Sequence, residues 1–177
     1  MRKHRTFDPD EIGERHCDEF NEAKNLRELS IIALLYIEYY LNEILLEKFI
    51  HPKKVIDENE LGSFKNKLTI LEALGVFDGH KALLINIRLI QKIRNFYAHN
   101  ILQVDSAPAS VSDKVKQLVY FDMDGNIGEY DVAWEEHTDP LEAQLQVCAL
   151  ETTNQLIEIH AKEKMKPNQN KSVFTTP

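Results

Sequence analysis

An arginine and a histidine lie five positions apart in the run from Arg94 to His99, which reads RNFYAH. Imidazole accepts and donates protons near neutral pH, which suits acid–base catalysis. Guanidinium carries a fixed positive charge and donates paired hydrogen bonds to phosphate oxygens. RNA cleavage by attack of the ribose 2′-hydroxyl needs a proton acceptor, a proton donor and a cation for the phosphorane. The residue types in this run therefore suit chemistry on a phosphodiester.

The run lies near the end of an amphipathic stretch, predicted to be a helix from Asp78-Gly79 to about His99 or Leu102. His99 lies one turn after Asn95, at a spacing that permits a hydrogen bond between them. Arg94 lies at the edge of the apolar arc, about 140° from His99 and about 7.5 Å along the axis. An arginine there must extend to solvent or find an anion.

A preceding stretch, Leu26 to Ile50, is predicted to be a long core helix that Pro52 stops. Its polar side chains make a membrane span too costly. Glu38 and Asn42 lie on one of its apolar stripes, where a carboxylate needs a partner. We therefore expect Glu38 to orient Arg94 or His99.

The arginine–histidine pair also has a structural interpretation. Both residue types, near the C-terminus of a helix, satisfy free carbonyls and complement the helix dipole. In the catalytic interpretation, Asn95 would position the phosphate or hold the imidazole tautomer. One pair is sparse for all three catalytic tasks, so two pairs facing each other across a homodimer are more plausible. The helix from Leu26, apolar all round, also indicates a dimer.

Start and stop signals place the remaining helices. Asp8-Pro9 starts a helix that runs to about Glu22, and Asp139-Pro140 starts the last one, to about Met165. A third helix is capped by Ser63 and ends at Gly75.

The segment between the motif and the last helix has a different pattern. Residues 103–113 are small and polar, which predicts a mobile loop. The β-prone runs 117–121 and 127–132 flank Asp124-Gly125, which predicts a hairpin. The chain is therefore expected to be an all-α bundle of about five helices with a small β-hairpin before the last. Residues 1–166 would form one domain and residues 167–177 a disordered tail.

The composition of the chain limits the kinds of function that it can have. A net charge of −8 and a pI near 5.4 argue against holding duplex DNA by bulk charge, but they permit a small basic cleft. Cys17 and Cys148 form no disulfide framework, which favours a reducing, cytoplasmic setting. The seven histidines have no metal-ligand spacing, so neither a metal nor another cofactor is expected.

The run from Arg94 to His99 resembles the R-N-x-x-x-H form of the R-x(4–6)-H motif of HEPN domains. These are helical bundles, many of them metal-independent endoribonucleases of toxin–antitoxin, phage-defence and RNA-processing systems. The resemblance implies a HEPN-like bundle, a single-stranded RNA substrate, an antitoxin as a candidate partner, and dimers whose motifs face one another. It also implies a polar or acidic residue on a preceding helix near the site, which Glu38 or Asn42 would match.

A second resemblance spans about Leu26 to Leu102. The segments LGSFKNKL from Leu61 and LGVF from Leu74, followed by the motif helix, are similar to the mannitol operon regulator family. Those HEPN-like proteins are thought to regulate transcription, and their R…H positions are often degenerate, whereas the motif is intact here.

Two functions therefore remain open. The first is a metal-independent endoribonuclease with His99 as general acid/base, Arg94 stabilising the phosphorane, and Asn95, Glu38 and Asn42 in support. The second is a non-catalytic transcriptional-regulatory or protein-interaction module.

Overall fold

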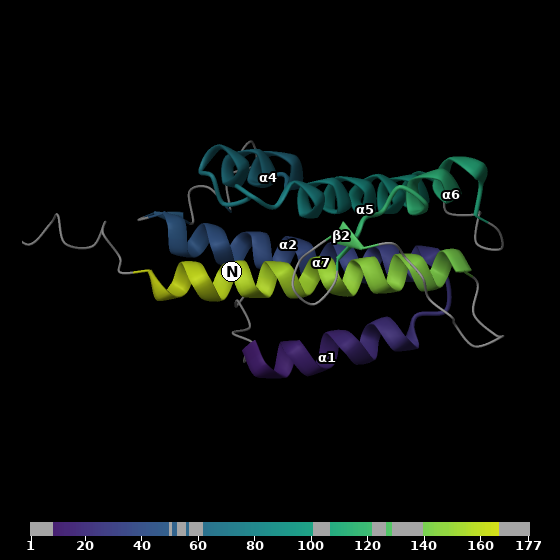
Figure 1. Cartoon of the computed structure of the whole chain (residues 1–177), viewed down its shortest axis with the longest axis horizontal. Helices are drawn as coiled ribbons and strands as arrows, with labels where there is room; N and C mark the ends of the chain where they lie inside the picture. The colour runs from purple at the N-terminus through teal and green to yellow at the C-terminus, as the bar shows by residue number, and fades with distance from the viewer. Residues whose placement is uncertain are drawn as a thin grey trace, which may run out of the picture.

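The helices pack in three layers in the computed structural model, which describes residues 9–49, 51, 52, 56, 62–100, 107–121, 127, 128 and 140–166. Two long helices, α2 (Leu26–Lys48) and α7 (Pro140–Met165), lie side by side in the middle layer (Figure 1). On one side lies α1 (Pro9–Glu22). On the other side lie α4 (Phe64–Ala73), α5 (Lys81–His99) and α6 (Ala109–Val115). The fold is all-α, with six helices in the described part of the chain.

The helices of the middle layer run parallel and form the centre of the core. At their C-terminal ends, Lys48 Nζ lies 2.6 Å from Glu163 Oε2. Both helices contribute fully buried aliphatic side chains to the core, including Ile37, Leu41, Leu145 and Leu156. Among the described residues, α2 is the one helix long and apolar enough to cross a membrane, and half of its most apolar window is buried.

Several helix ends follow the sequence signals. The Asn25 side chain caps α2 by accepting a hydrogen bond from the Glu28 amide at 2.9 Å, and Ser63 caps α4. Gly75, with φ of +70°, follows the end of α4 in the left-handed conformation that favours glycine. The fourth predicted helix begins later than expected, at Lys81, because Gly79 (φ +84°) remains in the preceding turn.

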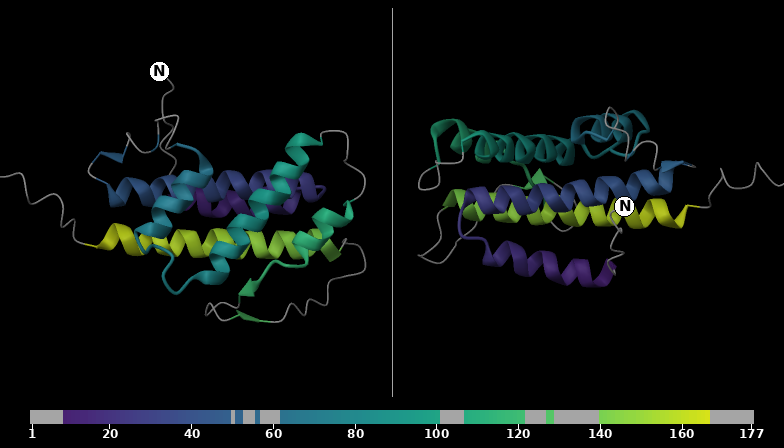
Figure 2. Two further views of the ribbon diagram at one scale, coloured as in Figure 1. Left: turned by 90° about the horizontal axis from the view of Figure 1, so that it is seen from above. Right: turned by 180° about the vertical axis from the view of Figure 1, so that it is seen from behind.

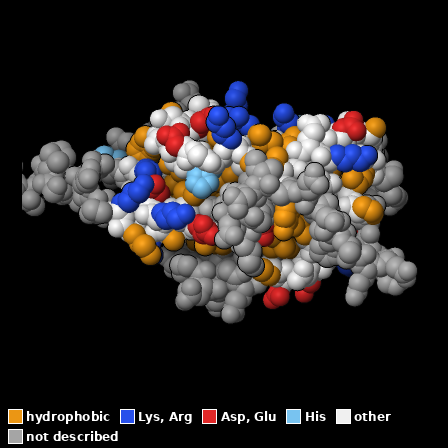
Figure 3. All heavy atoms as spheres, in the orientation of Figure 1, with side chains coloured by type: hydrophobic (Ala, Val, Ile, Leu, Met, Phe, Trp, Pro, Cys, Tyr) orange, Lys and Arg blue, Asp and Glu red, His pale blue; other side chains and the backbone are white. Residues whose placement is uncertain are grey.

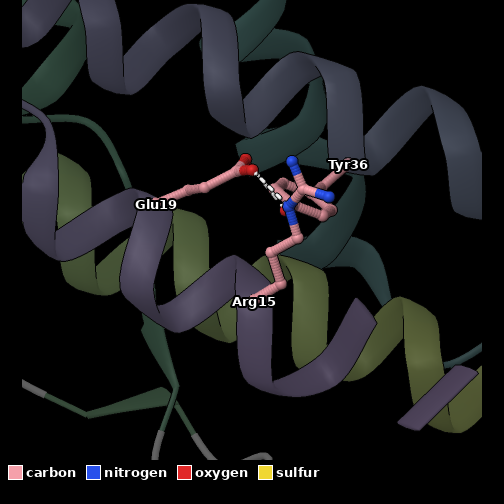
Figure 4. A network of polar contacts seen from close by, with 3 residues as sticks. All are labelled: Arg15, Glu19 and Tyr36. Atoms are coloured by element: carbon pink, nitrogen blue, oxygen red, sulfur yellow. Dashed lines mark hydrogen bonds and ion pairs between the residues drawn. The ribbon is translucent and has the colours of Figure 1, made fainter. Parts of the chain in front are cut away.

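A polar contact fastens α1 to α2. The Tyr36 hydroxyl donates to Glu19 Oε2 at 2.9 Å, and Arg15 Nε donates to the other oxygen at 2.8 Å (Figure 4). Burial, together with the bond to this carboxylate, raises the pKa of Tyr36. The contact positions the outermost helix against the side of α2 that faces away from α5.

The expectation of a loop over residues 103–113 is wrong from Ala109 onward, where α6 begins. Residues 101–106 lie outside the described part. The helix carries only two buried apolar side chains, Val111 and Val115, one turn apart on its inner face. Two positions are too few for a periodic pattern, and packing against α5 and α7 stabilises the helix instead.

Two-residue strands, β1 (Tyr120–Phe121) and β2 (Ile127–Gly128), pair antiparallel where the longer runs were expected. Just before β1, the side-chain amide of buried Asn86 on α5 bonds the Val119 backbone twice: Nδ2 donates to the carbonyl at 2.7 Å, and Oδ1 accepts from the amide at 2.8 Å. This pair of bonds replaces a strand partner at Val119. The turn at Asp124-Gly125 and the C-terminal tail lie outside the described residues.

Candidate functional site

The candidate site lies at the C-terminal end of α5, which crosses over the first half of α2 (Figure 2). The side chains of Arg94 and His99 are both exposed to solvent, and Asn95 between them is partly buried. On an ideal helix the two side chains leave the axis about 140° apart and about 7.5 Å apart along it. Arg94 therefore extends to solvent from the edge of the apolar arc.

The hydrogen bonds of the motif are few. Arg94 Nη1 donates to Asn95 Oδ1 at 3.2 Å, so the amide oxygen of Asn95 faces the arginine rather than His99. His99 forms no hydrogen bond or ion pair with another described residue. Within the described part of the chain, the guanidinium therefore bonds only Asn95, and the imidazole bonds no residue.

The end of α5 is capped by a different residue. Asn100 donates to the Phe96 carbonyl twice, from its side chain at 2.8 Å and from its backbone amide at 3.1 Å. Arg94 and His99 bond no carbonyl of a described residue. The structural interpretation of the pair, in which these side chains satisfy the free carbonyls of the helix end, therefore has no support in the hydrogen bonds.

Glu38 pairs with Lys67, which corrects the expectation that it would orient Arg94 or His99. Lys67 Nζ donates to Glu38 Oε1 at 2.8 Å, with the lysine side chain 6% exposed and the glutamate side chain 38% exposed. The ammonium group comes from α4, so this ion pair joins α4 to α2. No bond links Glu38 to the motif among the described residues.

Asn42 lies one turn after Glu38 on α2 and likewise forms no bond to the motif within the described residues. Its Oδ1 atom is buried and has no hydrogen-bond donor there. Asn42 lies on the same side of α2 as Ile31, Leu35 and Leu46. These three side chains are 37%, 64% and 40% exposed. We call these four residues the outer stripe of α2. On the helical wheel they fall within about 60° of one another.

A groove of about 350 Å³ lies elsewhere, at the junction of α1 and α2. It is lined by Glu19, Glu22, Ala23, Glu28, Ile31 and Ile32, so α5 contributes nothing to it. Within the described residues, no group of three or more His, Cys, Asp or Glu side chains is arranged to hold a metal ion.

Comparisons with known protein families, curated proteins and solved structures give no match for this chain. The motif and its surroundings are therefore the features that bear on function. There the pair combines a proton-transfer group with a fixed cation, and the Asn95 amide nitrogen is left as a further donor. Each of these groups can contact a phosphate oxygen, and the imidazole can also transfer a proton.

Two buried polar residues, Lys67 and Asn86, were not predicted from the sequence. Lys67 is buried although lysine is normally exposed, and its pairing depends on the angle between α4 and α2. Asn86 interrupts the apolar pattern of α5, and that interruption is the signal that could have identified it.

Proposed function

We propose that this chain is a metal-independent endoribonuclease of HEPN type, acting on single-stranded RNA through Arg94 and His99. One observation carries the proposal: both side chains are exposed and free of bonds to the helix end, which Asn100 caps. An arginine and a histidine held this way have no stabilising task in the described fold. Intact R-N-x-x-x-H spacing at the end of a long helix supports the same conclusion.

The proposed reaction proceeds without external groups. His99 removes the proton from the ribose 2′-hydroxyl, whose oxygen attacks phosphorus, and the bond from phosphorus to the 5′-oxygen breaks. The Arg94 guanidinium stabilises the extra negative charge on the phosphorane oxygens. In a homodimer, the leaving 5′-oxygen takes a proton from His99 of the partner subunit, and the products are a 2′,3′-cyclic phosphate and a 5′-hydroxyl. Arginine supplies the charge stabilisation for which other nucleases use a metal ion.

The outer stripe of α2 supports a homodimer as the working form. Leu35 at its centre is 64% exposed, and three large aliphatic side chains on one line are unusual for a solvated helix face. The motif end of α5 crosses over the same half of α2 that carries Ile31 and Leu35 (Figure 2). A second copy docked on this stripe would therefore bring its own Arg94 and His99 toward those of the first.

Cleavage of a mixed-sequence single-stranded RNA in EDTA tests the proposal. Wild type should cut and leave cyclic-phosphate ends. Arg94→Ala and His99→Ala should each lose about 10²–10⁴-fold in rate, the usual contribution of an acid–base or charge-stabilising group. His80→Ala provides a matched control at the other end of α5, because its side chain makes no capping bond there.

The stability of the variants separates catalytic from structural roles. Exposed residues without bonds to the core should change the free energy of unfolding by no more than about 0.5 kcal/mol. Absence of cleavage by pure wild-type dimer, on RNA of every tested sequence, would refute the nuclease. Destabilisation of about 2 kcal/mol by either alanine variant would instead assign the pair a structural role.

The outer stripe of α2 also favours a second function, a non-catalytic regulatory or protein-interaction module. An apolar face of this kind fits another protein as well as a second copy. Leu35→Glu distinguishes the two functions. In the nuclease it should give monomers in sedimentation equilibrium and abolish cleavage, whereas in the interaction module it should release a different protein and leave the chain's own mass unchanged.

A further inference from the structure

The solvent face of α5 carries a line of basic side chains that ends at the motif. Lys81, Arg88, Lys92 and His99 are all exposed, and we call them the basic stripe of α5. On an ideal helix they lie within about 20° of one line and extend over about 27 Å. They therefore form a straight path along the helix, with the candidate catalytic histidine at its end.

The charge of α5 contrasts with that of the whole chain. The chain has 29 acidic and 21 basic residues, yet the sequence of α5 contains four lysines and arginines and no aspartate or glutamate. Lys and Arg side chains lie along the upper edge of the molecule, over α4 and α5, with some acidic side chains beside them (Figure 3). A local positive surface on a molecule of net charge −8 is a feature that a polyanion can recognise.

The cations on this face differ in how far they are already neutralised. Arg88 Nη2 lies 2.7 Å from Glu72 Oε2 on α4, so its charge is partly compensated. Lys81, Lys92 and Arg94 pair with no carboxylate of a described residue. Lys81 and Lys92 are therefore the stripe positions most available to an incoming anion.

We propose that the basic stripe of α5 binds the phosphate backbone of single-stranded RNA and leads it to Arg94 and His99. The proposal rests on the proposed endoribonuclease function for the choice of RNA. A length of about 27 Å suits the shorter sites that proteins use for single strands, about four nucleotides. A flexible strand can follow a straight row of cations on a convex helix, where it needs no groove for its bases.

Binding of an uncleavable RNA tests the stripe without requiring catalysis. The probe is a fluorescein-labelled, fully 2′-O-methylated RNA of mixed sequence, followed by anisotropy in EDTA over a range of salt concentrations. We compare wild type with Lys81→Gln/Lys92→Gln. The control is Lys24→Gln/Lys164→Gln, which removes two exposed lysines from other elements and changes the net charge equally.

The expected effect follows from counterion release. Each contact of a cation with a single-stranded phosphate contributes about 0.7 to the slope of log affinity against log salt concentration. Loss of two contacts therefore lowers the slope by about 1.4, and it lowers the affinity about 25-fold at about 0.1 M salt. The control pair should bind as wild type does. Equal weakening of RNA binding in both double variants, or no weakening in either, would overturn the proposal that the basic stripe of α5 binds RNA.

The choice of ligand is tested in the same assay. If polyglutamate of matched charge displaces the labelled RNA as well as unlabelled RNA does, the surface is a site for acidic polypeptides and the proposal fails. Absence of RNA binding by wild type at low salt would overturn it as well.

The assays distinguish failure of the proposed RNA-binding stripe from failure of the proposed nuclease activity. With cleavable RNA, Lys81→Gln/Lys92→Gln should raise KM about 25-fold and leave kcat unchanged, because the lysines do not contact the reacting atoms. Lysine-dependent binding without any cleavage would support the stripe and refute the nuclease. Cleavage with an unchanged KM in the lysine variant would support the nuclease and refute the stripe.

Discussion

Truncation of Glu38 should be costly because it leaves a buried ammonium group without its counter-ion. Lys67 is 6% exposed, and its Nζ donates to Glu38 Oε1 at 2.8 Å. Removing one partner of a fully buried pair costs about 3–5 kcal/mol. The carboxylate here is 38% exposed, so water can enter the space and replace part of the lost interaction. We therefore expect Glu38→Ala to lower the free energy of unfolding by about 2 kcal/mol, below the fully buried range.

Removal of the other partner should have a much smaller effect. Lys67→Met keeps the length and the apolar contacts of the buried stem, and the remaining carboxylate is exposed enough to hydrate. We expect a loss of at most about 0.5–1 kcal/mol, the ordinary contribution of an exposed pair. The double variant should resemble Lys67→Met alone, because it contains no unpaired buried charge.

Urea unfolding followed by far-ultraviolet circular dichroism measures all four proteins of this cycle. If Lys67→Met costs as much stability as Glu38→Ala, or if Glu38→Ala is as stable as wild type, the Lys67 ammonium does not depend on Glu38 as its counter-ion. RNA cleavage by the double variant adds a functional comparison. Near-wild-type cleavage would place Glu38 in the scaffold, whereas loss of cleavage from a stable double variant would return it to the candidate site.

Three further predictions concern buried polar groups. Asn86→Leu should cost about 2–3 kcal/mol in chemical unfolding, because the Val119 amide and carbonyl lose their partners, and a cost below about 0.5 kcal/mol would contradict this. Burial raises the pKa of Glu163, but hydrogen bonds from Lys166 and Lys48 outweigh it and give a net lowering. The stabilisation by Glu163 is therefore present above the ordinary carboxyl pKa and is lost as pH falls through the lowered pKa of Glu163. Lys48→Met should make the free energy of unfolding fall less steeply as pH is lowered through this range. Burial raises the pKa of Cys148 to about 12, so a thiol reagent should label exposed Cys17 quickly and Cys148 only on unfolding; two fast thiols would refute the burial.

The sequence predicted the parts of the fold that depend on local chemistry. Pro9 and Pro140 start α1 and α7, and Ser63 and Gly75 bound α4, because capping and left-handed turns depend on neighbouring residues alone. It did not predict α6, whose stability depends on neighbours distant in sequence. The segment at Val119 was predicted to be strand from its β-propensity, but its backbone bonds go to the Asn86 side chain.

The sequence also predicted only part of the candidate site. Helical periodicity placed Arg94 at the edge of the apolar arc, and its side chain does extend to solvent. The partner of Glu38 could not be predicted, because periodicity within α2 and α4 does not define the angle between them. The sequence offered Arg94 or His99 as the partner of Glu38, whereas the packing of α4 on α2 brings Lys67 to the carboxylate.

The parallel pairing of α2 with α7 has a consequence for synthesis of the protein. These helices share the most extensive contact in the fold, yet α2 ends at Lys48 and α7 ends at Met165. At about 5–20 residues per second, a ribosome would need roughly 6–24 s to make the chain between those two points. Throughout that interval the most apolar helix of the protein lacks the partner that covers its inner face. The nascent chain is therefore expected to depend on chaperones until α7 has been made, and the proposed RNA cleavage would begin only once α7 covers α2.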